Sequence, residues 1–390
     1  MIWEMPERPR KKSSIVFVGG GHAHLYSLLR TREMVRRGFR VTLIDPSPYL
    51  YYSGMATGVI SGAYAPDEHR INVCRLVREG GGSFIEGRMA GIRAESRELA
   101  LETGEIIPYD AASFCLGSEI RADGLTQSAA RAIPIKPVEH TGEIRRRLLS
   151  LGENSAPRVL VVGGGAAGCE VAANTLALLD RQGLHGRLTL AEEGGSLLAD
   201  APKKARQEIQ DFLIAKGARV LTDTLVTSFD GNAAWTRDGR QIPYDLPIMA
   251  VGVSPPALFH ESHLPTGDDG GLRVDRYLRS TGDERLFGGG DCISYRGEGL
   301  PKLGVFAVRQ APVIFHNLQA VLEGEPLAEY EPQRRFLYIL NLGDGTGLAT
   351  YGPLVWRGRL SWKLKHHIDK KFVEEHRRQQ PKNGSKSRRP

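Results

Sequence analysis

The hydrophobic pattern of the chain repeats one arrangement at two places: a short apolar strand, a triple glycine and then a helical pattern. The first copy is residues 15–18 followed by the glycines 19–21, and the second is residues 159–162 followed by the glycines 163–165. A short apolar run that ends at turn residues is typical of a strand. Each copy therefore predicts a strand, a tight turn and a helix, in that order.

After its helical pattern, each copy leads to a second apolar strand that ends in an acidic residue. These strands are residues 41–45, ending in Asp45, and residues 188–192, ending in Glu192. Two such βαβ units about 145 residues apart indicate two nucleotide-binding domains, each a parallel sheet with helical crossovers. The predicted fold class is therefore α/β, with two Rossmann-like domains.

The remaining pattern sets the predicted boundaries. Pro157 marks the entry to the second unit, and the glycine-rich strand end at residues 286–291 returns the chain to the first domain. Residues 337–340 and 348–351 predict a β-hairpin, followed by a basic helix over about residues 360–376. The predicted regions are a first nucleotide domain (13–118 and 275–330), a second nucleotide domain (119–274), a small α+β region (331–376) and a disordered polar tail (377–390).

The second glycine turn fits the dinucleotide pattern completely. Gly163 permits the tight turn, Gly165 lets the backbone approach the pyrophosphate, and Gly168 lets the helix pack on the strand. Glu192 is placed for a ribose 2′-hydroxyl. No Arg or Lys directly follows Glu192 to receive a 2′-phosphate, so the sequence favours NADH over NADPH in this domain.

The first turn departs from the pattern, because the third glycine position holds His24. Gly19 and Gly21 are present and Asp45 supplies the ribose carboxylate, but a side chain at position 24 is expected to loosen helix–strand packing or reorient the helix. We expect FAD here, since a returning Gly290-Asp291 pair can bind the ribityl chain. The alternative is two ordinary α/β domains with fortuitous glycines.

Charge and cysteines narrow the class further. The net charge is +7, but the basic residues crowd the first dozen and last thirty positions, and no compact nucleic-acid motif accompanies them. No stretch of about 18 apolar residues predicts a membrane span, and the N-terminus lacks a secretory h-region. The four cysteines form no close pair, so we interpret them as packing residues in a reducing cytoplasm. His22 and His24 resemble a metal pair, but no third ligand accompanies them, so no metal is expected.

At this point the residues carry a family resemblance over nearly the whole length. The chain resembles the type II NADH dehydrogenase and sulfide:quinone oxidoreductase superfamily of FAD-dependent pyridine nucleotide-disulfide oxidoreductases. It is most similar to the oxidoreductase found alone or fused to selenophosphate synthetase. The segments that carry the resemblance are residues 19–24, 52–55, 109–110 with 117–118, 304–310, and 362–365 with 368–369.

The resemblance implies a glutathione-reductase-like architecture, FAD in the first domain and His24 as a family feature. It places a Tyr52–Gly58 turn and residues 304–310 near the isoalloxazine ring. It also implies a catalytic role for Glu170, which would shuttle protons to a quinone if burial raised its pKa towards neutrality. The alternative is a carboxylate that suits the helix dipole.

Residue pattern and resemblance together give one set of expected cofactor-binding residues. For FAD and NADH they are Gly19, Gly21, His22, Ala23, His24, Asp45, Ser53, Gly54, Met55, Gly117, Gly163, Gly165, Gly168, Glu192, Gly252, Gly290, Asp291, Val305 and Phe306.

The expected reaction is transfer of hydride from NADH to flavin N5, followed by electron transfer to a quinone. One alternative is a soluble NADH-dependent reductase with an acceptor in selenium or sulfur metabolism. Another is a sulfide:quinone oxidoreductase-like enzyme in which Cys115 and Cys292 meet in space, and a non-enzymatic alternative is a nucleotide-bound redox sensor.

The C-terminal helix bears on the acceptor. Leu360, Leu364, Ile368 and Phe372 recur at helical spacing with Trp362 beside them, and the intervening face is rich in lysine. Such a helix can lie in the headgroup plane of a membrane, or it can pack its stripe on the parent domain or on a second subunit. The expected location is the cytoplasm. If the helix lies on a membrane, the protein is expected to contact the inner face of the cell membrane.

Overall fold

The computed structural model describes residues 12–120, 132–152, 156–297 and 299–377. The chain divides into two compact units, and each is described by itself. The first contains Met1–Leu50, Asn72–Ser118 and Pro255–Pro332, and the second contains Tyr51–Ile71, Glu119–Ser254 and Gln333–Pro390. The expected disordered tail lies, apart from Arg377, outside the described residues.

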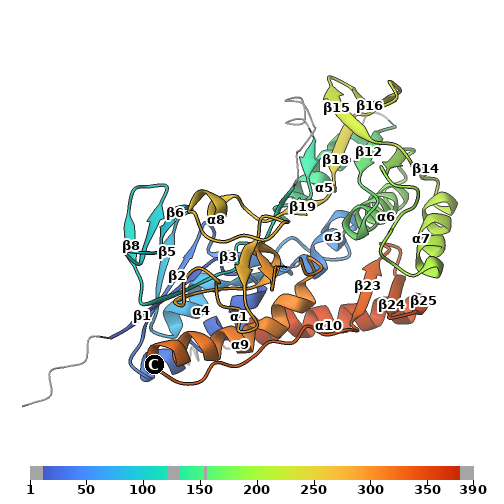
Figure 1. The fold of residues 1–390 in the computed structure, drawn as a ribbon. Helices are drawn as coiled ribbons and strands as arrows, with labels where there is room; N and C mark the ends of the chain where they lie inside the picture. The colour runs from blue at the N-terminus through green and yellow to red at the C-terminus, as the bar shows by residue number, and fades with distance from the viewer. Residues whose placement is uncertain (1–11, 121–131, 153–155, 298, 378–390) are drawn as a thin grey trace, which may run out of the picture. The chain divides into compact units, whose positions relative to one another are not determined.

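The first unit is built on a five-stranded parallel sheet with strand order β21-β9-β1-β2-β5 (Figure 1). Its central strand is buried along its whole length, as the apolar run predicts. Helix α1 and the long helix α9 pack against each other. The sheet strands are β1 (Ser14–Val18), β2 (Arg40–Asp45), β5 (Ser83–Glu86), β9 (Ala111–Phe114) and β21 (Leu286–Gly288).

Helices and smaller strands complete this unit. The helices are α1 (His22–Leu29), α2 (Thr31–Arg36), α4 (Val73–Glu79), α8 (Leu258–Glu261), α9 (Gly304–Glu323) and the 3-10 turn η2 (Gly290–Cys292). An antiparallel meander comprises β6 (Met89–Arg93), β7 (Glu98–Leu101) and β8 (Ile106–Pro108), and β20 (Leu272–Val274) pairs with β22 (Ile293–Tyr295). The chain passes between the two units within β3 (Tyr49–Tyr51) and again within β4 (Arg70–Asn72), and these two strands pair with each other.

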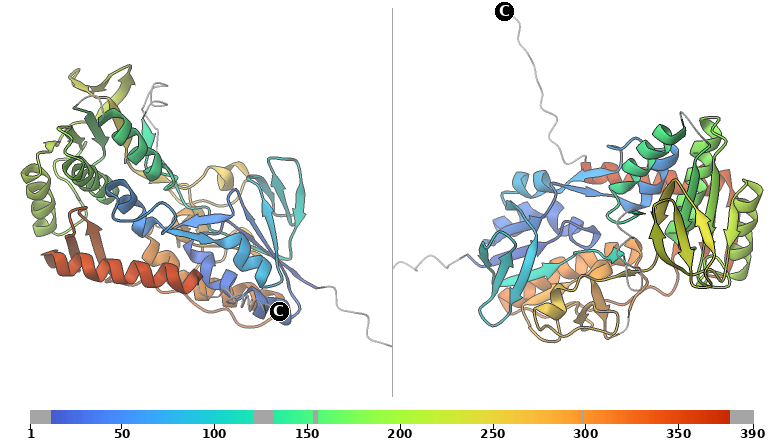
Figure 2. Two further views of the ribbon diagram at one scale, coloured as in Figure 1. Left: turned by 180° about the vertical axis from the view of Figure 1, so that it is seen from behind. Right: turned by 90° about the horizontal axis from the view of Figure 1, so that it is seen from above.

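The second unit repeats the design with a five-stranded parallel sheet of order β11-β18-β12-β13-β14 (Figure 2). The strands are β11 (Ile133–Pro134), β12 (Arg158–Val162), β13 (Arg187–Ala191), β14 (Arg219–Leu221) and β18 (Leu246–Met249). The helices are α3 (Ser53–Ser61), α5 (His140–Gly152), α6 (Ala166–Arg181) and α7 (Lys203–Ala215). The smaller strands are β15 (Val226–Asp230), β16 (Ala233–Thr236) and β17 (Gln241–Pro243), and the pair β10 (Glu119–Ile120) with β19 (Val253–Ser254).

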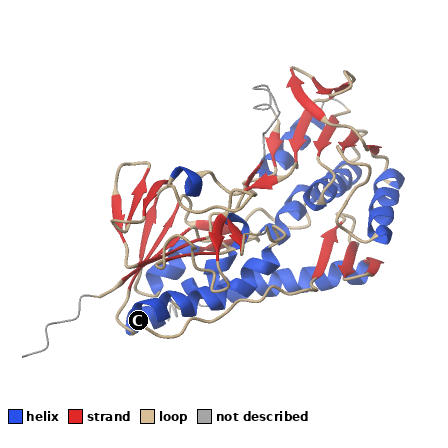
Figure 3. Ribbon diagram, viewed as in Figure 1, coloured by secondary structure: helices blue, strands red, loops and turns tan. Residues whose placement is uncertain are grey.

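The C-terminal region belongs to the second unit and shares its core. The strands β23 (Leu337–Asn341), β24 (Gly347–Tyr351) and β25 (Leu354–Gly358) form an antiparallel sheet, so the predicted hairpin has a third strand (Figure 3). Helix α10 (Arg359–Arg377) follows. Leu340, Leu348 and Val355 enter one buried cluster with strands β12 and β13 and helix α6.

The observed division differs from the sequence-based boundaries at two further segments. Residues 255–274 lie in the first unit, although the sequence placed them with the second nucleotide domain. Residues 51–71 lie in the second unit, where α3 packs on α5 and α6. In both cases a short segment packs on elements far away in the sequence: α8 contacts β6 of the first unit, and Ile60 of α3 enters the main core cluster of the second.

Candidate functional site: two glycine turns and a buried carboxyl cluster

The first glycine of each turn has a backbone conformation that side chains disfavour. Gly19 has φ of +86° and Gly163 has φ of +105°. A Cβ atom would lie 2.3 Å from the carbonyl oxygen of Cys115 at Gly19 and 2.4 Å from that of Ala250 at Gly163. Both turns therefore need glycine for the same two reasons: positive φ and a neighbouring strand end pressed against Cα.

The acidic residues at the strand ends are held by the turns. The Gly20 N–H donates to Asp45 Oδ2 at 2.6 Å, and the Gly164 N–H donates to Glu192 Oε2 at 2.5 Å. Each carboxylate also accepts a second backbone N–H, from Ser47 and Gly194 respectively. Each acid therefore has a fixed position beside its glycine turn, as binding of a ribose hydroxyl requires.

The helices after the turns begin without side-chain caps. Gly21 is the N-cap of α1 and Gly165 is the N-cap of α6, and neither helix start receives a side-chain hydrogen bond. The first-turn N–H groups of such a helix attract phosphate. A Cβ at Gly165 would meet no atom within 4 Å, so a ligand can approach this backbone closely. These observations fit a dinucleotide in each unit.

The third position of the motif is filled differently in the two turns. At Gly168 a Cβ would lie 1.9 Å from the Gly163 carbonyl oxygen. At the matching position of the first turn, His24 Nδ1 lies 2.6 Å from the Gly19 carbonyl oxygen and Nε2 lies 2.8 Å from Ser113 Oγ. His24 is fully buried, and the expectation that it loosens the packing is wrong, because the ring itself joins helix, turn and strand.

His24 is neutral in this environment. Burial lowers its pKa to about 4, against the opposing effect of the Gly19 hydrogen bond. Since a carbonyl can only accept, we assign the proton to Nδ1, and Nε2 then accepts from the Ser113 hydroxyl. His24 is therefore a structural part of the turn.

Other expected flavin-site residues of the first unit gather near this turn. Ser118 Oγ donates to Asp291 Oδ2 at 2.8 Å next to Gly117, and the Gly290 N–H donates to Gln310 Oε1 at 2.7 Å. Gln310 was not among the expected site residues, although it lies in the 304–310 segment. His22 and Ala23 begin α1, and Val305 and Phe306 begin α9, whose start has no side-chain cap either.

The segment predicted as a turn near the flavin is a helix in the second unit. Ser53, Gly54 and Met55 form the first turn of α3, with Tyr52 as the N-cap residue. A Cβ at Gly54 would lie 2.7 Å from the Tyr52 ring. The glycine therefore serves aromatic packing at this helix start.

Glu170 lies in α6 with its carboxyl group buried. Its Oε1 accepts the Asn341 N–H at 2.6 Å, and Asn174 Nδ2 binds the carbonyl oxygens of both residues. Burial raises the pKa of Glu170 to about 7, although the charge of Lys365 and the Asn341 hydrogen bond act against it. The dipole interpretation is weakened, because Glu170 is the fifth residue of the helix and outside its first turn.

A second buried carboxylate, Asp369, lies close enough to influence Glu170. Tyr52 donates to Asp369 Oδ1 at 2.9 Å, and Lys365 Nζ lies 3.0 Å from Asp369 Oδ2 and 2.7 Å from the Gly54 carbonyl oxygen. Burial, followed by the charge and hydrogen bond of Asp369, raises the pKa of the Tyr52 hydroxyl well above its usual range. The negative charge of Asp369 also raises the pKa of Glu170.

Sequence reasoning missed this cluster because it assigned Lys365 to an exposed basic face. The i,i+4 spacing of Lys365 and Asp369 on a predicted helix was the available signal. Lys370 was assigned to the same face, and it pairs with Glu68 at 2.7 Å. Phe372 belongs to the apolar stripe, for which membrane contact and packing on protein were both expected alternatives, and it stacks on Tyr52 with ring centroids 4.8 Å apart. The placements of Lys365 and Lys370 are corrections, because α10 packs this side on the Tyr52–His69 segment.

The cysteines are placed as packing residues. Cys115, Cys169 and Cys292 are buried and Cys74 is partly buried, all as free thiols. Burial raises the pKa of the Cys292 thiol to about 11 and that of Cys115 further. Thiols of this kind are poor nucleophiles at neutral pH. Within the described residues, no group of three or more His, Cys, Asp or Glu side chains could hold a metal ion.

The second turn is closed by the segment after β18. The carbonyl oxygen of Ala250 presses against Gly163, and the expected site residue Gly252 follows two positions later in an exposed connection to β19.

The helices described here include none that is both long and apolar enough to cross a membrane.

Comparison with known proteins identifies the family of this chain and several relatives. Residues 13–311 match the family model described as pyridine nucleotide-disulphide oxidoreductase. The chain is 28% identical over 366 residues to demethylphylloquinone reductase NdbB of Synechocystis sp., with 89% of each chain covered. It is 26% identical over 375 residues to the NADH dehydrogenase-like protein YutJ of Bacillus subtilis, covering 90% of this chain and 99% of the relative.

The solved structures agree at the level of the fold. The structure of NDH2 from Plasmodium falciparum in complex with NADH aligns with a TM-score of 0.81 at 15% identity, covering 93% of this chain and 96% of that chain. The α/β fold class with two Rossmann-like sheets is therefore confirmed.

Proposed function

The chain belongs to the pyridine nucleotide-disulphide oxidoreductase family, and from this premise we propose that it is an NADH:quinone oxidoreductase that uses FAD. Two fixed glycine turns, each with its strand-end acid, account for two dinucleotides. The chemistry that FAD supplies when bound is acceptance of a hydride and delivery of the electron pair to a second substrate. The protein provides orientation and a site shielded from water.

The buried carboxyl group of Glu170 is the reason for proposing a quinone as the electron acceptor. Reduction of a quinone to a quinol consumes protons as well as electrons. A carboxyl group with a pKa near 7 can give and regain a proton at the pH of the cell. The names of the relatives, a demethylphylloquinone reductase and an NADH dehydrogenase-like protein, support the same acceptor class.

Anaerobic half-reactions test this function. NADH should bleach the flavin of the purified protein, and a panel of quinones should restore its colour faster than oxidised sulfur or selenium compounds, such as polysulfide or selenite, do. Bleaching without reoxidation by any quinone would remove the proposed acceptor class while leaving the NADH dehydrogenase step intact.

The finer resemblance, to the oxidoreductase found fused to selenophosphate synthetase, makes selenium or sulfur compounds the competing acceptors in that panel. Chemistry of the sulfide:quinone type needs a reactive thiol. Burial raises the pKa of both Cys115 and Cys292, which favours their packing role.

We also propose that α10 holds the protein at a membrane surface, on the inner face of the cell membrane. One side of α10 packs on the second unit through Ser361, Asp369 and Val373. A neighbouring side of the helix leaves Leu360 78% exposed, with Leu364 and Ile368 exposed beside it. Leu354 of the preceding sheet is 61% exposed. Exposed apolar side chains between lysines suit the boundary between headgroups and acyl chains.

Vesicle sedimentation tests this contact. The double variant L360S/L364S should lose most of its binding to anionic vesicles, because the substitutions remove exposed apolar side chains without touching the packed side of α10. The control is I214S on α7, where another large apolar residue is 51% exposed. Equal sedimentation of wild type and the double variant would contradict the membrane contact.

A further inference from the structure

Quinone reduction requires Glu170 to regain a proton from solvent after each turnover. The two charged groups that act on Glu170, Lys365 and Asp369, are themselves shielded from solvent, with side chains 11% and 5% exposed. They also pair with each other at 3.0 Å. The proton therefore has to reach Glu170 through other groups of the second unit.

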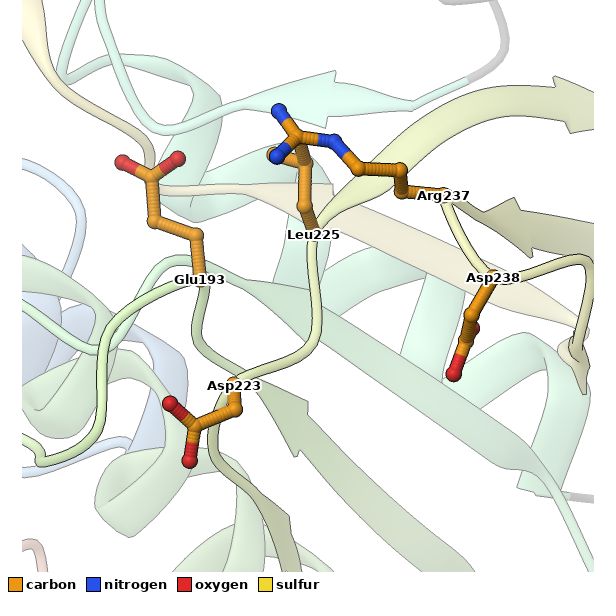
Figure 4. A pocket seen from close by; sticks show the side chains of 5 residues that line it. All are labelled: Glu193, Asp223, Leu225, Arg237 and Asp238. Carbon is orange, nitrogen blue, oxygen red and sulfur yellow. The ribbon is translucent and has the colours of Figure 1, made fainter.

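A cavity of about 320 Å³ in the second unit lies in the region of the second glycine turn (Figure 4). The Thr224 N–H donates to the Glu192 carbonyl oxygen at 2.8 Å, so the cavity adjoins the strand-end acid of that turn. Glu170, in contrast, has its hydrogen-bond partner on β23 and its charged neighbours on α10. The lining residues follow β13, β14 and β16, and they are Glu193, Asp223, Leu225, Arg237 and Asp238.

His366 of α10 and Tyr64 form a polar pair that leads from the surface of the second unit to its interior. His366 Nδ1 lies 3.2 Å from the Tyr64 hydroxyl oxygen, and the two rings are parallel within 2°. Trp362, one helical turn earlier, stacks on the His366 ring with centroids 4.9 Å apart. His366 is half-buried, whereas Tyr64 is only 3% exposed. The aromatic contacts therefore hold an imidazole at the surface with one nitrogen on a buried hydroxyl group.

The Tyr64 ring lies against the residue that binds the Glu170 carboxyl group. A Cβ at Gly58 would lie 2.5 Å from Tyr64 Cδ2 and 3.1 Å from the side-chain nitrogen of Asn341, so both side chains meet at this glycine. The backbone N–H of the same Asn341 donates to Glu170. Burial, the charge of Asp369 and then that of Glu170 raise the pKa of the Tyr64 hydroxyl well above its usual range. Tyr64 therefore contacts the imidazole on one side and approaches the buried carboxyl group on the other.

The surroundings of His366 leave its imidazole uncharged at neutral pH. Burial has the largest effect and lowers its pKa. Lys370 and His367 lower this pKa further, whereas Asp369 and Glu68 raise it, and Lys370 pairs with Glu68 at 2.7 Å. A neutral imidazole can bind a proton at one ring nitrogen while it releases the proton of the other.

We propose that His366 and Tyr64 form the route by which Glu170 regains its proton from solvent. A proton from water binds to His366 Nε2, and the proton on Nδ1 passes to the Tyr64 oxygen. The Tyr64 hydroxyl proton passes through a bridging water molecule to the Glu170 carboxylate. One proton leaves the solvent and one arrives on Glu170, Tyr64 stays neutral, and exchange with water restores the starting tautomer of His366. The inference rests on the proposed function and adds two relay residues to it.

Stopped-flow measurement of proton uptake tests this route. The NADH-reduced, FAD-loaded protein is mixed with a quinone in weakly buffered solution containing a pH-indicator dye, and flavin reoxidation and proton uptake are recorded together. In the wild type, uptake should keep pace with reoxidation. H366Q keeps a polar side chain that cannot carry a proton, so its uptake should lag about tenfold behind reoxidation. Imidazole added to the solution should shorten that lag, which a purely structural defect would not allow.

Two further variants complete the test. Y64F keeps the ring that packs on Gly58 and removes the hydroxyl group, so its uptake should lag in the same way, and imidazole should leave the lag unchanged. H367Q is the matched control, because it changes the exposed histidine next to His366, and it should follow the wild-type time course.

The outcomes separate the route from the proposed function. Uptake in step with reoxidation in H366Q or Y64F overturns the route, and so does an equal lag in H367Q. A lag in H366Q that imidazole does not shorten also overturns it. If no quinone reoxidises the wild-type flavin, the proposed function is overturned and the route with it.

Discussion

Glu170 and Asp369 are two carboxyl groups buried in the same unit with different partners. Asp369 accepts the Tyr52 hydroxyl and pairs with Lys365, so its negative charge has compensation at hydrogen-bond distance. Glu170 accepts a hydrogen bond from the Asn341 N–H, and the charge of Lys365 lowers its pKa. Burial has the largest effect on this pKa and raises it. Two similar groups in different environments can therefore take different roles, one as a partner in an ion pair and one as a proton carrier.

The first prediction concerns the pH dependence of quinone reduction. The pKa of Glu170 is raised to about 7, so the protonated, proton-donating form predominates below that pH and is lost as the pH rises through it. Reoxidation of the reduced flavin by quinone should slow above about pH 7, which gives the pH–rate profile a falling limb. E170Q should lose this limb and react about 10²-fold more slowly. Stopped-flow reoxidation measures both effects. The rate of bleaching by NADH is the control and should change little; a pH limb that persists in E170Q contradicts the assignment.

Substitutions of Lys365 and Asp369 should shift the pH of that falling limb in opposite directions. D369N removes a negative charge that raises the pKa of Glu170, so the limb should move to lower pH. K365M removes a positive charge that lowers this pKa, so the limb should move to higher pH. Y52F keeps both charges and is the matched control. Shifts in the same direction for the two charge variants would show that the cluster acts through packing and not through its field.

At the scale of elements, each strand–turn–helix unit is specified by a few backbone demands. The first glycine is required by positive φ and by a carbonyl oxygen of a neighbouring strand end. The third position can be met in two ways, by Gly168 with no side chain or by His24 with a ring that binds the same turn carbonyl. The motif therefore constrains hydrogen bonding and space, and it does not require glycine at each position.

Two alanine variants should separate packing from ligand binding in the second turn. G168A places Cβ against the Gly163 carbonyl oxygen and should destabilise the protein by about 2 kcal/mol or more. G165A meets no protein atom within 4 Å, so its melting temperature should equal that of the wild type, while NADH binding weakens about tenfold because the methyl group lies where phosphate approaches. Thermal unfolding and NADH titration measure the pair. Unchanged NADH affinity in G165A would contradict phosphate binding at this turn.

At the scale of the whole molecule, neither unit is one continuous piece of chain. The second is completed by residues from Gln333 onwards, and Leu340, Leu342, Leu348 and Val355 of this segment lie in its main core cluster. The C-terminal region that the sequence separates as a small α+β appendage is thus part of the nucleotide-binding unit. It also supplies the Asn341 N–H that binds Glu170.

Deletion from Gln333 should therefore unfold more than a peripheral element. Loss of four buried aliphatic side chains exposes core surface worth several kcal/mol, which approaches the total stability of an ordinary domain. The truncated protein should aggregate or melt without a cooperative transition in a calorimeter. L360S/L364S, which changes exposed residues of the same segment, should melt as the wild type does. A cooperative, unshifted transition after the deletion would show that the segment is a separate domain.

The sequence by itself determined the two strand–glycine–helix units and their strand-end acids, while Glu170 was implied by the family resemblance. The two units depend on neighbours within a few positions, because positive φ, close approach of the backbone and the period of buried residues are local demands. The raised pKa of Glu170 could be stated only as a condition, since burial depends on what packs around the group.

Only the tertiary structure decided how His24 fits its turn and which face of α10 is buried. Each outcome depends on partners distant in the chain: Ser113 for His24 and Gly54 for Lys365. The periodicity of a helix shows that two faces exist. The side that is covered follows from the surface that the rest of the chain presents to it.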